Sequence, residues 1–407
     1  MININDSNRQ DCCGCSACMN ICPVNAIEMK PDTQGFLYPI VNDSTCINCG
    51  KCESVCSVIN NPEEKEFEQE AYLIQHRDKE ILEDSTSGGA FTAISQAVMK
   101  KGGVVFGAAF GENFYVRHEY AESEKELQRF RNSKYVQSDK LRTYSEVKEF
   151  LNHDRYVLFS GTPCEIEGLM NFLGDLSSSD KLLTSDIICH AVPSPYVLNT
   201  YLNIQKKKND GSILDLRFRD KKKYGYMYSQ FAVIREDSRV YEGIETNIFL
   251  RAFFSNVCDR PSCYECRFKK RYRRSDFTLW DCWNASELSR NIAFNQNSGV
   301  TRMLVHSERG RSFLNDILRN CIYEKINADD AVRSGSREMT HSVPKDKERY
   351  DRFWTAFHEN PEEALRKFFP MDFRVRAESF LRRFAFRTGI YSLVRKMYKK
   401  FFGERRR

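Results

Sequence analysis

The chain has 407 residues, of which 41% are hydrophobic and 13% aromatic. This size and composition predict two or three folded units and exclude a disordered protein. The net charge of +6 is concentrated at the end of the chain, where residues 362–407 contain 14 Lys and Arg against 5 Asp and Glu. No segment has a signal-peptide pattern or approaches the roughly 18 apolar residues of a membrane span. We therefore expect a cytoplasmic protein whose cysteines stay reduced, which favours metal ligation over disulfides.

The sixteen cysteines fall into two regions, and nine of them lie within residues 12–56. Eight of these nine form two copies of the spacing C-x2-C-x2-C-x3-C, which is typical of ferredoxins with two 4Fe–4S clusters. Because the last cysteine of each copy reaches the other cube, the spacing predicts crossed ligand sets. The sets are Cys12, Cys15, Cys18 and Cys56 for one cluster, and Cys46, Cys49, Cys52 and Cys22 for the other.

A zinc site is the alternative for paired C-x2-C motifs, but zinc needs only four of the eight thiolates. The doubled motif therefore favours iron–sulfur clusters, and residues 10–58 resemble bacterial two-cluster ferredoxins, which transfer electrons. Cys13 breaks the triplet spacing and receives no role. The same holds for Cys258, Cys282 and Cys321.

An acidic stretch at residues 61–70 reads as a linker, and strand and helix patterns alternate after it. Strands are expected from Ala71, at 104–110, 155–160 and 181–189, and in the runs FAVIRED and DFTLWDCW. Helices are expected at 89–101, from Thr162, and at 195–208, 245–256 and 308–320. The predicted fold class is α+β, with a small two-cluster ferredoxin-like domain (1–60), a two-part α/β catalytic region (61–154 and 155–345) and a basic helical tail (346–407).

Two strand-to-helix turns carry candidate chemistry. Ser87, Gly88 and Gly89 precede a helix, whose free N–H groups suit a phosphate, although a Ser/Gly turn at this place is also ordinary helix capping. In the second turn, Thr162 precedes Cys164, which lies in the first turn of a helix, where the dipole favours a thiolate. This pattern leaves three roles open for Cys164: a redox nucleophile, a metal ligand or a small buried residue.

Two further segments contain cysteines. Cys189 and His190 end an apolar strand, at the edge where α/β sheets collect ligands. Cys263 and Cys266 form a C-x2-C pair, which is metal-binding or redox-active in an intracellular chain. From spacing alone, the four cysteines either converge on a third cluster or remain scattered buried thiols.

Six segments in this order resemble the beta-subunit family of coenzyme F420-reducing hydrogenase and F420-dependent dehydrogenases. They are STSGGAFTAIS, SKYVQS, SGTPCE, DIICHAVPSP, RPSCYECRFKKRYRRSDFTLWDCW and SGVTRMLV, and they cover residues 70–310. The resemblance implies an oxidoreductase that binds FAD beside a 4Fe–4S cluster and exchanges a hydride with a deazaflavin or another small molecule. The run Trp280-Asp281-Cys282-Trp283 departs from the family pattern, which leaves the natural acceptor open.

Site residues follow from the same resemblance by matching position. It favours Cys164, Cys189, Cys263 and Cys266 as ligands of a third cluster. It implies Ser87, Gly88, Gly89, Lys134, Tyr135 and Thr162 as flavin contacts, and His190 as a catalytic polar group beside the flavin or substrate.

Family members also occur in bacteria that do not make coenzyme F420, near genes for surface polysaccharide assembly. The alternative function is therefore an electron-wiring subunit of a partner enzyme, and a redox partner protein or a ferredoxin is expected in either case. The basic, aromatic segment 373–407 predicts an amphipathic helix that contacts an anionic membrane surface or an acidic partner, or packs on the core. Nucleic-acid binding is not expected, because no binding module is recognisable.

Overall fold

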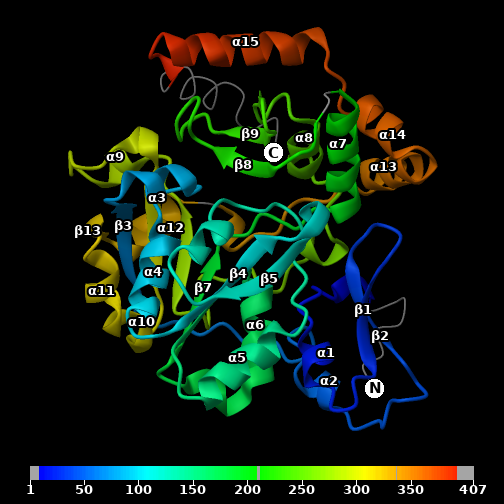
Figure 1. The fold of residues 1–407 in the computed structure, drawn as a ribbon, viewed down its shortest axis with the longest axis vertical. Coiled ribbons are helices and arrows are strands. Elements are labelled where there is room, and N and C mark those ends of the chain that lie inside the picture. Colours follow the sequence, from blue (N-terminus) through cyan, green and yellow to red (C-terminus); the bar gives the residue numbers. More distant parts are fainter. Residues whose placement is uncertain (1–8, 209–210, 336, 392–407) are drawn as a thin grey trace.

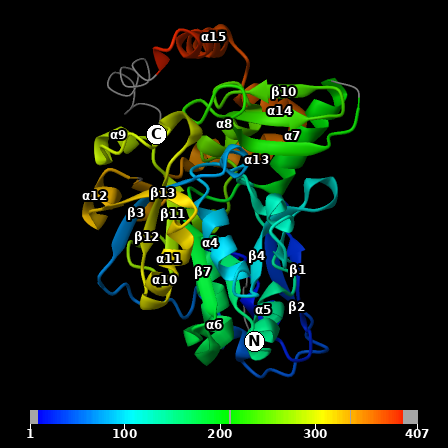
Figure 2. The same ribbon diagram turned by 60° about the vertical axis from the view of Figure 1, so that its left-hand side comes forward.

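The computed structural model describes residues 9–208, 211–335 and 337–391. Within them the chain forms a mixed α/β structure with a large mixed sheet, a small sheet and an N-terminal cysteine-rich domain (Figures 1 and 2). In these ranges no helix is both long and apolar enough to cross a membrane.

The N-terminal domain is built around two cysteine-bearing loops and a hairpin. Strands β1 (Ile27–Pro31) and β2 (Leu37–Val41) pair antiparallel. The helices are short: α1 (Ala17–Ile21), α2 (Lys51–Ser54) and the 3-10 turn η1 (Arg9–Asp11). The first two cysteines of each triplet therefore lie in a loop, and the third lies in the short helix that follows, Cys18 in α1 and Cys52 in α2.

The large sheet has eight strands in the order β13-β3-β12-β11-β7-β6-β4-β5. Its centre, β11, β7, β6 and β4, is parallel, and β12, β3, β13 and β5 pair antiparallel with their neighbours. The strands are β3 (Glu70–His76), β4 (Val104–Phe110), β5 (Val116–Ala121), β6 (Val157–Ser160), β7 (Leu182–Ile187), β11 (Phe277–Asp281), β12 (Thr301–Val305) and β13 (Cys321–Ile326). The parallel centre brings several carboxyl ends to one edge, where ligands of α/β proteins usually bind.

Helices cover both faces of this sheet. On one face, α4 (Ala90–Met99) and α11 (Leu314–Leu318) share a core with apolar side chains of β4, β6 and β7. On the other face, α5 (Thr143–Asn152) and α6 (Pro163–Leu173) pack on alternate residues of the same strands. The remaining helices around it are α3 (Lys79–Asp84), α9 (Ala285–Leu288), α10 (Glu308–Ser312), α12 (Ala328–Arg333), η2 (Glu112–Phe114), η3 (Glu126–Phe130), η4 (Gly174–Ser178), η5 (Pro261–Cys263), η6 (Gln296–Ser298) and η7 (Arg337–Met339).

The small sheet has the order β10-β9-β8 and forms a second core at one end of the large sheet (Figure 1). Its strands are β8 (Asp215–Asp220), β9 (Gln230–Ile234) and β10 (Arg239–Glu242). Helices α7 (Pro195–Lys208), α8 (Ile248–Phe254), α13 (Lys347–Glu359) and α14 (Pro361–Phe368) complete it. Residues 347–368, the start of the predicted tail, therefore belong to this core.

Helix α15 (Phe373–Arg387) follows and lies across the end of the small sheet (Figure 1). Ala385 packs with Tyr224 and Tyr228. Residues 392–407, the rest of the predicted basic helix, lie outside the described residues.

The predicted strands at 104–110, 155–160 and 181–189 and the predicted helices after Gly89 and Thr162 are confirmed. The predicted helix at 308–320 is divided into α10 and α11 at Phe313. The small sheet was only partly predicted, because FAVIRED was expected as a strand but β8 and β10 were not.

Candidate functional site

Cys12, Cys15, Cys18 and Cys56, the first predicted ligand set, lie together. Burial raises the pKa of the Cys18 thiol, and nearby Cys15, Cys12 and Cys56 raise it further. Burial also raises the pKa of Cys12, to which Cys15 and Cys56 add, and the Arg260 guanidinium opposes this rise. Such a group of thiols in a buried setting fits a 4Fe–4S cluster, whose negative charge would be offset in part by Arg260.

The second predicted set, Cys22, Cys46, Cys49 and Cys52, lies nearer the surface. Cys49 is exposed and the other three are half-buried. The backbone N–H of Ala26 donates a hydrogen bond to the Cys22 sulfur at 3.2 Å. Cys22, Cys52 and Cys56 pack around Cys18 and Ile27, so the two sets adjoin, as the crossed ligand pattern requires.

Three segments far apart in the sequence converge and bring together Cys164, Cys189 and the pair Cys263 and Cys266. Burial raises the pKa of Cys189 to about 12, with Cys164 and Cys266 adding to the shift. Burial also raises the pKa of Cys263, and there all three other thiols contribute. The ammonium of Lys269 holds the loop of Cys189 by donating to the carbonyl oxygens of Cys189 and His190. Four converging thiols fit a third 4Fe–4S cluster.

Cys13, which the sequence spacing left without a role, lies between two of these sets. Its sulfur neighbours Cys15 of the first set and Cys164 of the third, and interaction with Cys13 lowers the pKa of both of these thiols. Ser57 Oγ is 3.9 Å from the sulfurs of both Cys13 and Cys15. A single side chain thus spans the gap between the first and third thiol sets.

The spacing of the thiols can be compared with that of a single-ion site. Among residues 9–208, 211–335 and 337–391, no three His, Cys, Asp or Glu side chains are close enough to share one ion. An iron–sulfur cube separates its thiolates more widely than a zinc ion does, because each thiolate binds a different iron.

A pocket of about 1170 Å³ opens at the carboxyl edge of the large sheet. It is lined by the ends of β6, β7 and β11, by the turn before α4, and by Cys13 and Cys164. Ser87, Gly89, Lys134, Tyr135 and Thr162, five of the six predicted flavin contacts, line it as well. The pocket and the third thiol set therefore share a wall.

The glycines of the Ser/Gly turn are explained in part by packing. A Cβ on Gly88 would lie 2.2 Å from the carbonyl oxygen of Ile74, and Gly88 does not line the pocket. Gly89 has a φ of +82° and a Cβ there would meet His76 at 2.9 Å. Both glycines are therefore needed for the chain to turn into α4, with or without a ligand.

Other predicted site residues have partners of their own. The ammonium of Lys134 donates to the backbone oxygens of Arg129 and Arg131 at 2.8 and 3.0 Å. Thr162 Oγ1 is 3.2 Å from the sulfur of Cys164. His190 does not line the pocket: its Nε2 is 2.9 Å from Asn256 Oδ1 and its Nδ1 is 3.6 Å from Glu338, which does line it.

Sequence reasoning missed a buried polar cluster on the pocket wall, formed by His118, Lys140 and Glu165. Although burial opposes ionisation, the Lys140 ammonium and His118 lower the pKa of Glu165 to about 2. Burial lowers the pKa of His118 to about 4. Lys140 also lowers the pKa of Cys15 and Cys164, so it supplies a positive charge beside both thiolates. The sequence gives no signal for this cluster, because nothing in it shows that the fold buries Lys140.

An aromatic wall closes another side of the pocket, within the run that departs from the family pattern. The rings of Trp283 and Tyr226 stack with centroids 4.4 Å apart, and the Arg219 guanidinium lies 4.8 Å from the Trp283 centroid. Arg219 and Tyr226 are held by Asp281 at 3.1 and 2.9 Å. The wall is flat and fixed, which suits a planar ring system.

Two family models match the chain. Residues 11–59 match the 4Fe–4S dicluster domain, and residues 154–331 match the C terminus of the coenzyme F420 hydrogenase/dehydrogenase beta subunit. The chain joins these two domains. These two matches support an iron–sulfur oxidoreductase, the class that the sequence resemblance implied.

One solved structure similar to this chain belongs to the F420-reducing [NiFe] hydrogenase complex of Methanosarcina barkeri. The two chains are 16% identical, the match covers 73% of this chain and 92% of the other, and the TM-score is 0.45. The search of curated proteins gave no match.

The dicluster domain is clamped to the beta-subunit domain by Arg260. This buried guanidinium donates to the backbone oxygens of Cys12 and Leu37 at 2.7 and 3.0 Å, and it stacks over Tyr38 at 4.2 Å. Gly168 of α6 lies close to the dicluster domain, because a Cβ there would lie 2.8 Å from the sulfur of Cys15. The first thiol set is therefore built against the beta-subunit domain.

Proposed function

We propose that the chain is an iron–sulfur flavoprotein that passes electrons between two N-terminal clusters, a third cluster and FAD, and exchanges two electrons with a small molecule. The observation that carries the proposal is the position of Cys13, between Cys15 and Cys164 and on the wall of the large pocket. We place the clusters at the three thiol sets and the boundaries of the parts at 1–60, 61–154, 155–345 and 346–407.

The thiol sets differ in exposure, and this difference supports an order for the proposed clusters, from the surface to the pocket. The set containing Cys49 reaches the surface, whereas Cys15 and Cys18 are buried. A ferredoxin or another redox partner would therefore meet the exposed set, and the pocket is the place for the small molecule. Bound clusters carry single electrons, and a flavin exchanges them for a hydride.

The pocket residues suit FAD in two places. The N-terminal end of α4 at Gly89 and Ala90 faces the pocket and favours an anionic diphosphate. The Trp283 wall would support the isoalloxazine or an incoming ring, and His190 would act through Glu338 at its margin. Lys140 would hold negative charge near Cys13 and Cys164. Coenzyme F420 or another small molecule is the proposed partner in hydride exchange.

The first experiment is anaerobic purification followed by iron, sulfide and flavin analysis of one sample. We expect about twelve irons per chain, for three cubes, and one FAD. Flavin that dithionite reduces and a soluble acceptor reoxidises, with no other protein present, would support an enzyme. Reoxidation only in the presence of a partner protein would support the alternative, an electron-wiring subunit, for instance in surface polysaccharide biosynthesis.

A negative charge at Thr86 is expected to expel the flavin. Thr86 lines the pocket in the turn before α4, and it has no left-handed backbone to disturb. Thr86→Asp would place a carboxylate where the diphosphate approaches, and we expect the Kd for FAD to rise about ten-fold or more. Thr86→Asn is the control, because Asn has nearly the same shape as Asp but no charge. This variant should retain FAD, as measured by flavin fluorescence. Equal affinity in both variants would place the diphosphate elsewhere.

Helix α15 supports contact between the protein and the inner face of a membrane. Phe373, Phe380 and Phe384 are 83%, 68% and 53% exposed and repeat at helical spacing on the side away from Ala385. Exposed arginines accompany them: Arg374, Arg376, Arg383 and Arg387. An apolar stripe edged by cations is the pattern of a helix that lies on anionic lipid.

Replacing Phe380 and Phe384 with Ser is expected to lower the partition onto phosphatidylserine vesicles about ten-fold or more, since two apolar side chains lose their burial. Sedimentation with vesicles measures this, and higher salt should weaken binding of the unchanged protein. Ile292→Ser is the control, because Ile292 is exposed elsewhere. Equal sedimentation of all three proteins would contradict membrane contact.

A further inference from the structure

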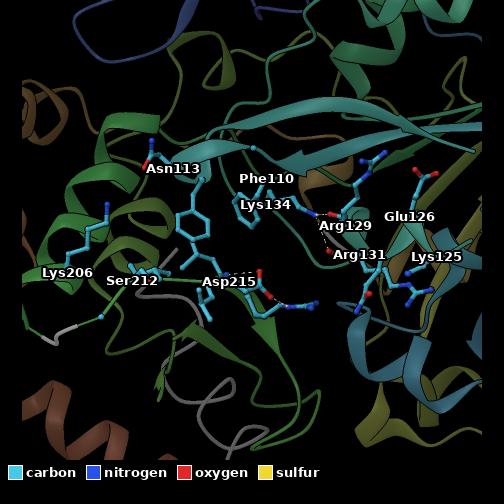
Figure 3. Close-up of a pocket in the computed structure, with 18 residues that line it drawn as sticks. Phe110, Asn113, Lys125, Glu126, Arg129, Arg131, Lys134, Lys206, Ser212 and Asp215 are labelled. Atoms are coloured by element: carbon cyan, nitrogen blue, oxygen red, sulfur yellow. Dashed lines mark hydrogen bonds and ion pairs between the residues drawn. The ribbon is translucent and has the colours of Figure 1, made fainter. Parts of the chain in front are cut away.

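A second pocket of about 980 Å³ lies beside the first and is lined by more positive than negative side chains. Six cationic residues and two anionic residues contribute to it. They are Lys125, Arg129, Arg131, Lys134, Lys206 and Arg217, against Glu126 and Asp215. Figure 3 shows Lys206 on one side of the pocket, Arg129 and Arg131 on the other, and Lys134 between them.

Ion pairs offset part of this charge, since Glu119 pairs with Arg129 at 3.2 Å, and the lining itself still holds more cations than anions. Arg131 and Arg217 both face the same carboxylate, Asp84, each at 3.8 Å. Arg217 also pairs with Asp215 at 2.7 Å. Burial and the nearby Arg217 lower the pKa of Lys134 to about 7, as expected where cations crowd one another.

The pocket also has a shaped aromatic side. Phe110 packs edge-on against Phe114 at 5.5 Å and stacks with Phe218 at 6.2 Å. Phe114 has a φ of +62°, which is unusual for a bulky residue, and its turn holds that ring in place. Ile213 and Leu214 add apolar surface. The pocket therefore suits a small molecule with an anionic part and an apolar part.

We propose that this second pocket binds the anionic part of the small molecule whose reacting group enters the large pocket. Arg131 and Lys134 line both pockets, so one molecule can extend from one to the other. The assignment of the anion to the reacting molecule rests on the proposed function. The ligand class is a small polyanion, carrying either phosphate groups or several carboxylates.

Isothermal titration of the full-length chain, purified without oxygen and loaded with iron and FAD, tests the site. Pyrophosphate and citrate are the probes, and the tighter of the two identifies phosphate or carboxylate as the preferred group. We expect Arg217→Gln to weaken binding about ten-fold and Lys206→Gln about five-fold.

Lys207→Gln is the matched control, since it removes the same charge one residue away, where Lys207 pairs with Glu362 at 2.5 Å. Lys207→Gln should leave the affinity for both probes unchanged. Lys206→Gln changes only an exposed side chain, so the variant should fold like the unchanged protein. Absence of binding by both probes, or equal weakening by Lys206→Gln and Lys207→Gln, would overturn the site. Release of FAD by pyrophosphate would also overturn it, because the pocket would then hold the diphosphate of the flavin. Binding with the expected pattern in a chain that takes up no flavin would retain the site and refute the proposed function.

Discussion

Replacing Cys263 with Ser is expected to remove about four irons from each chain and to leave the two N-terminal clusters in place. Cys263 lies in a half-buried group with Cys189, Cys266 and Cys164, and an alcohol is a poor substitute for a thiolate there. Iron and sulfide analysis gives the count, and electron paramagnetic resonance of the reduced protein identifies the clusters that remain.

Cys258→Ala is the control for this experiment. Cys258 lies five positions away and is fully buried inside the small-sheet core, whereas Cys263 is half-buried at the margin of that core. Iron content should be the same in this variant as in the unchanged chain. Unchanged iron in Cys263→Ser would contradict the third cluster, and an equal loss in both variants would point to general unfolding.

Replacing Gly168 with Ala is expected to destabilise the protein by about 1–3 kcal/mol, because the new methyl group overlaps Cys15 at the junction of the two domains. Without such a neighbour, Gly to Ala in a helix stabilises by roughly 0.5–1 kcal/mol. The sign of the change in unfolding free energy, measured by denaturant titration without oxygen, therefore shows whether the methyl group overlaps Cys15. A more stable variant with full iron content would show that α6 does not press on this cysteine.

The sequence predicted most where one short segment contains the whole pattern. The dicluster domain follows from cysteine spacing within 45 residues, and the turns before α4 and α6 follow from strand and helix patterns. The third thiol set was left open by spacing alone, since Cys164 and Cys266 are brought together only by the order of strands β6, β7 and β11.

Other parts of the site have no local signal at all. Cys13 was set aside because it interrupts a motif, yet its role depends on Cys164, 151 positions away in the chain. Gly168 and Arg260 matter because another domain packs on them, and a single sequence does not reveal which helix face receives a partner. The polar cluster of Lys140 and Glu165 is likewise created by burial.

The acidic stretch at 61–70 that was predicted to be a linker is fastened along its length. Lys270 donates to Asn61, the backbone of Arg271 donates to Glu64, and Gln69 bonds with His306 at 2.9 Å. With Arg260 holding the other side, the dicluster domain is not a swinging arm that delivers electrons by collision. On the proposed function, electrons would tunnel between clusters whose separation the fold fixes. The rate of that step should therefore be insensitive to solvent viscosity, and diffusion should limit only the encounter with the external partner.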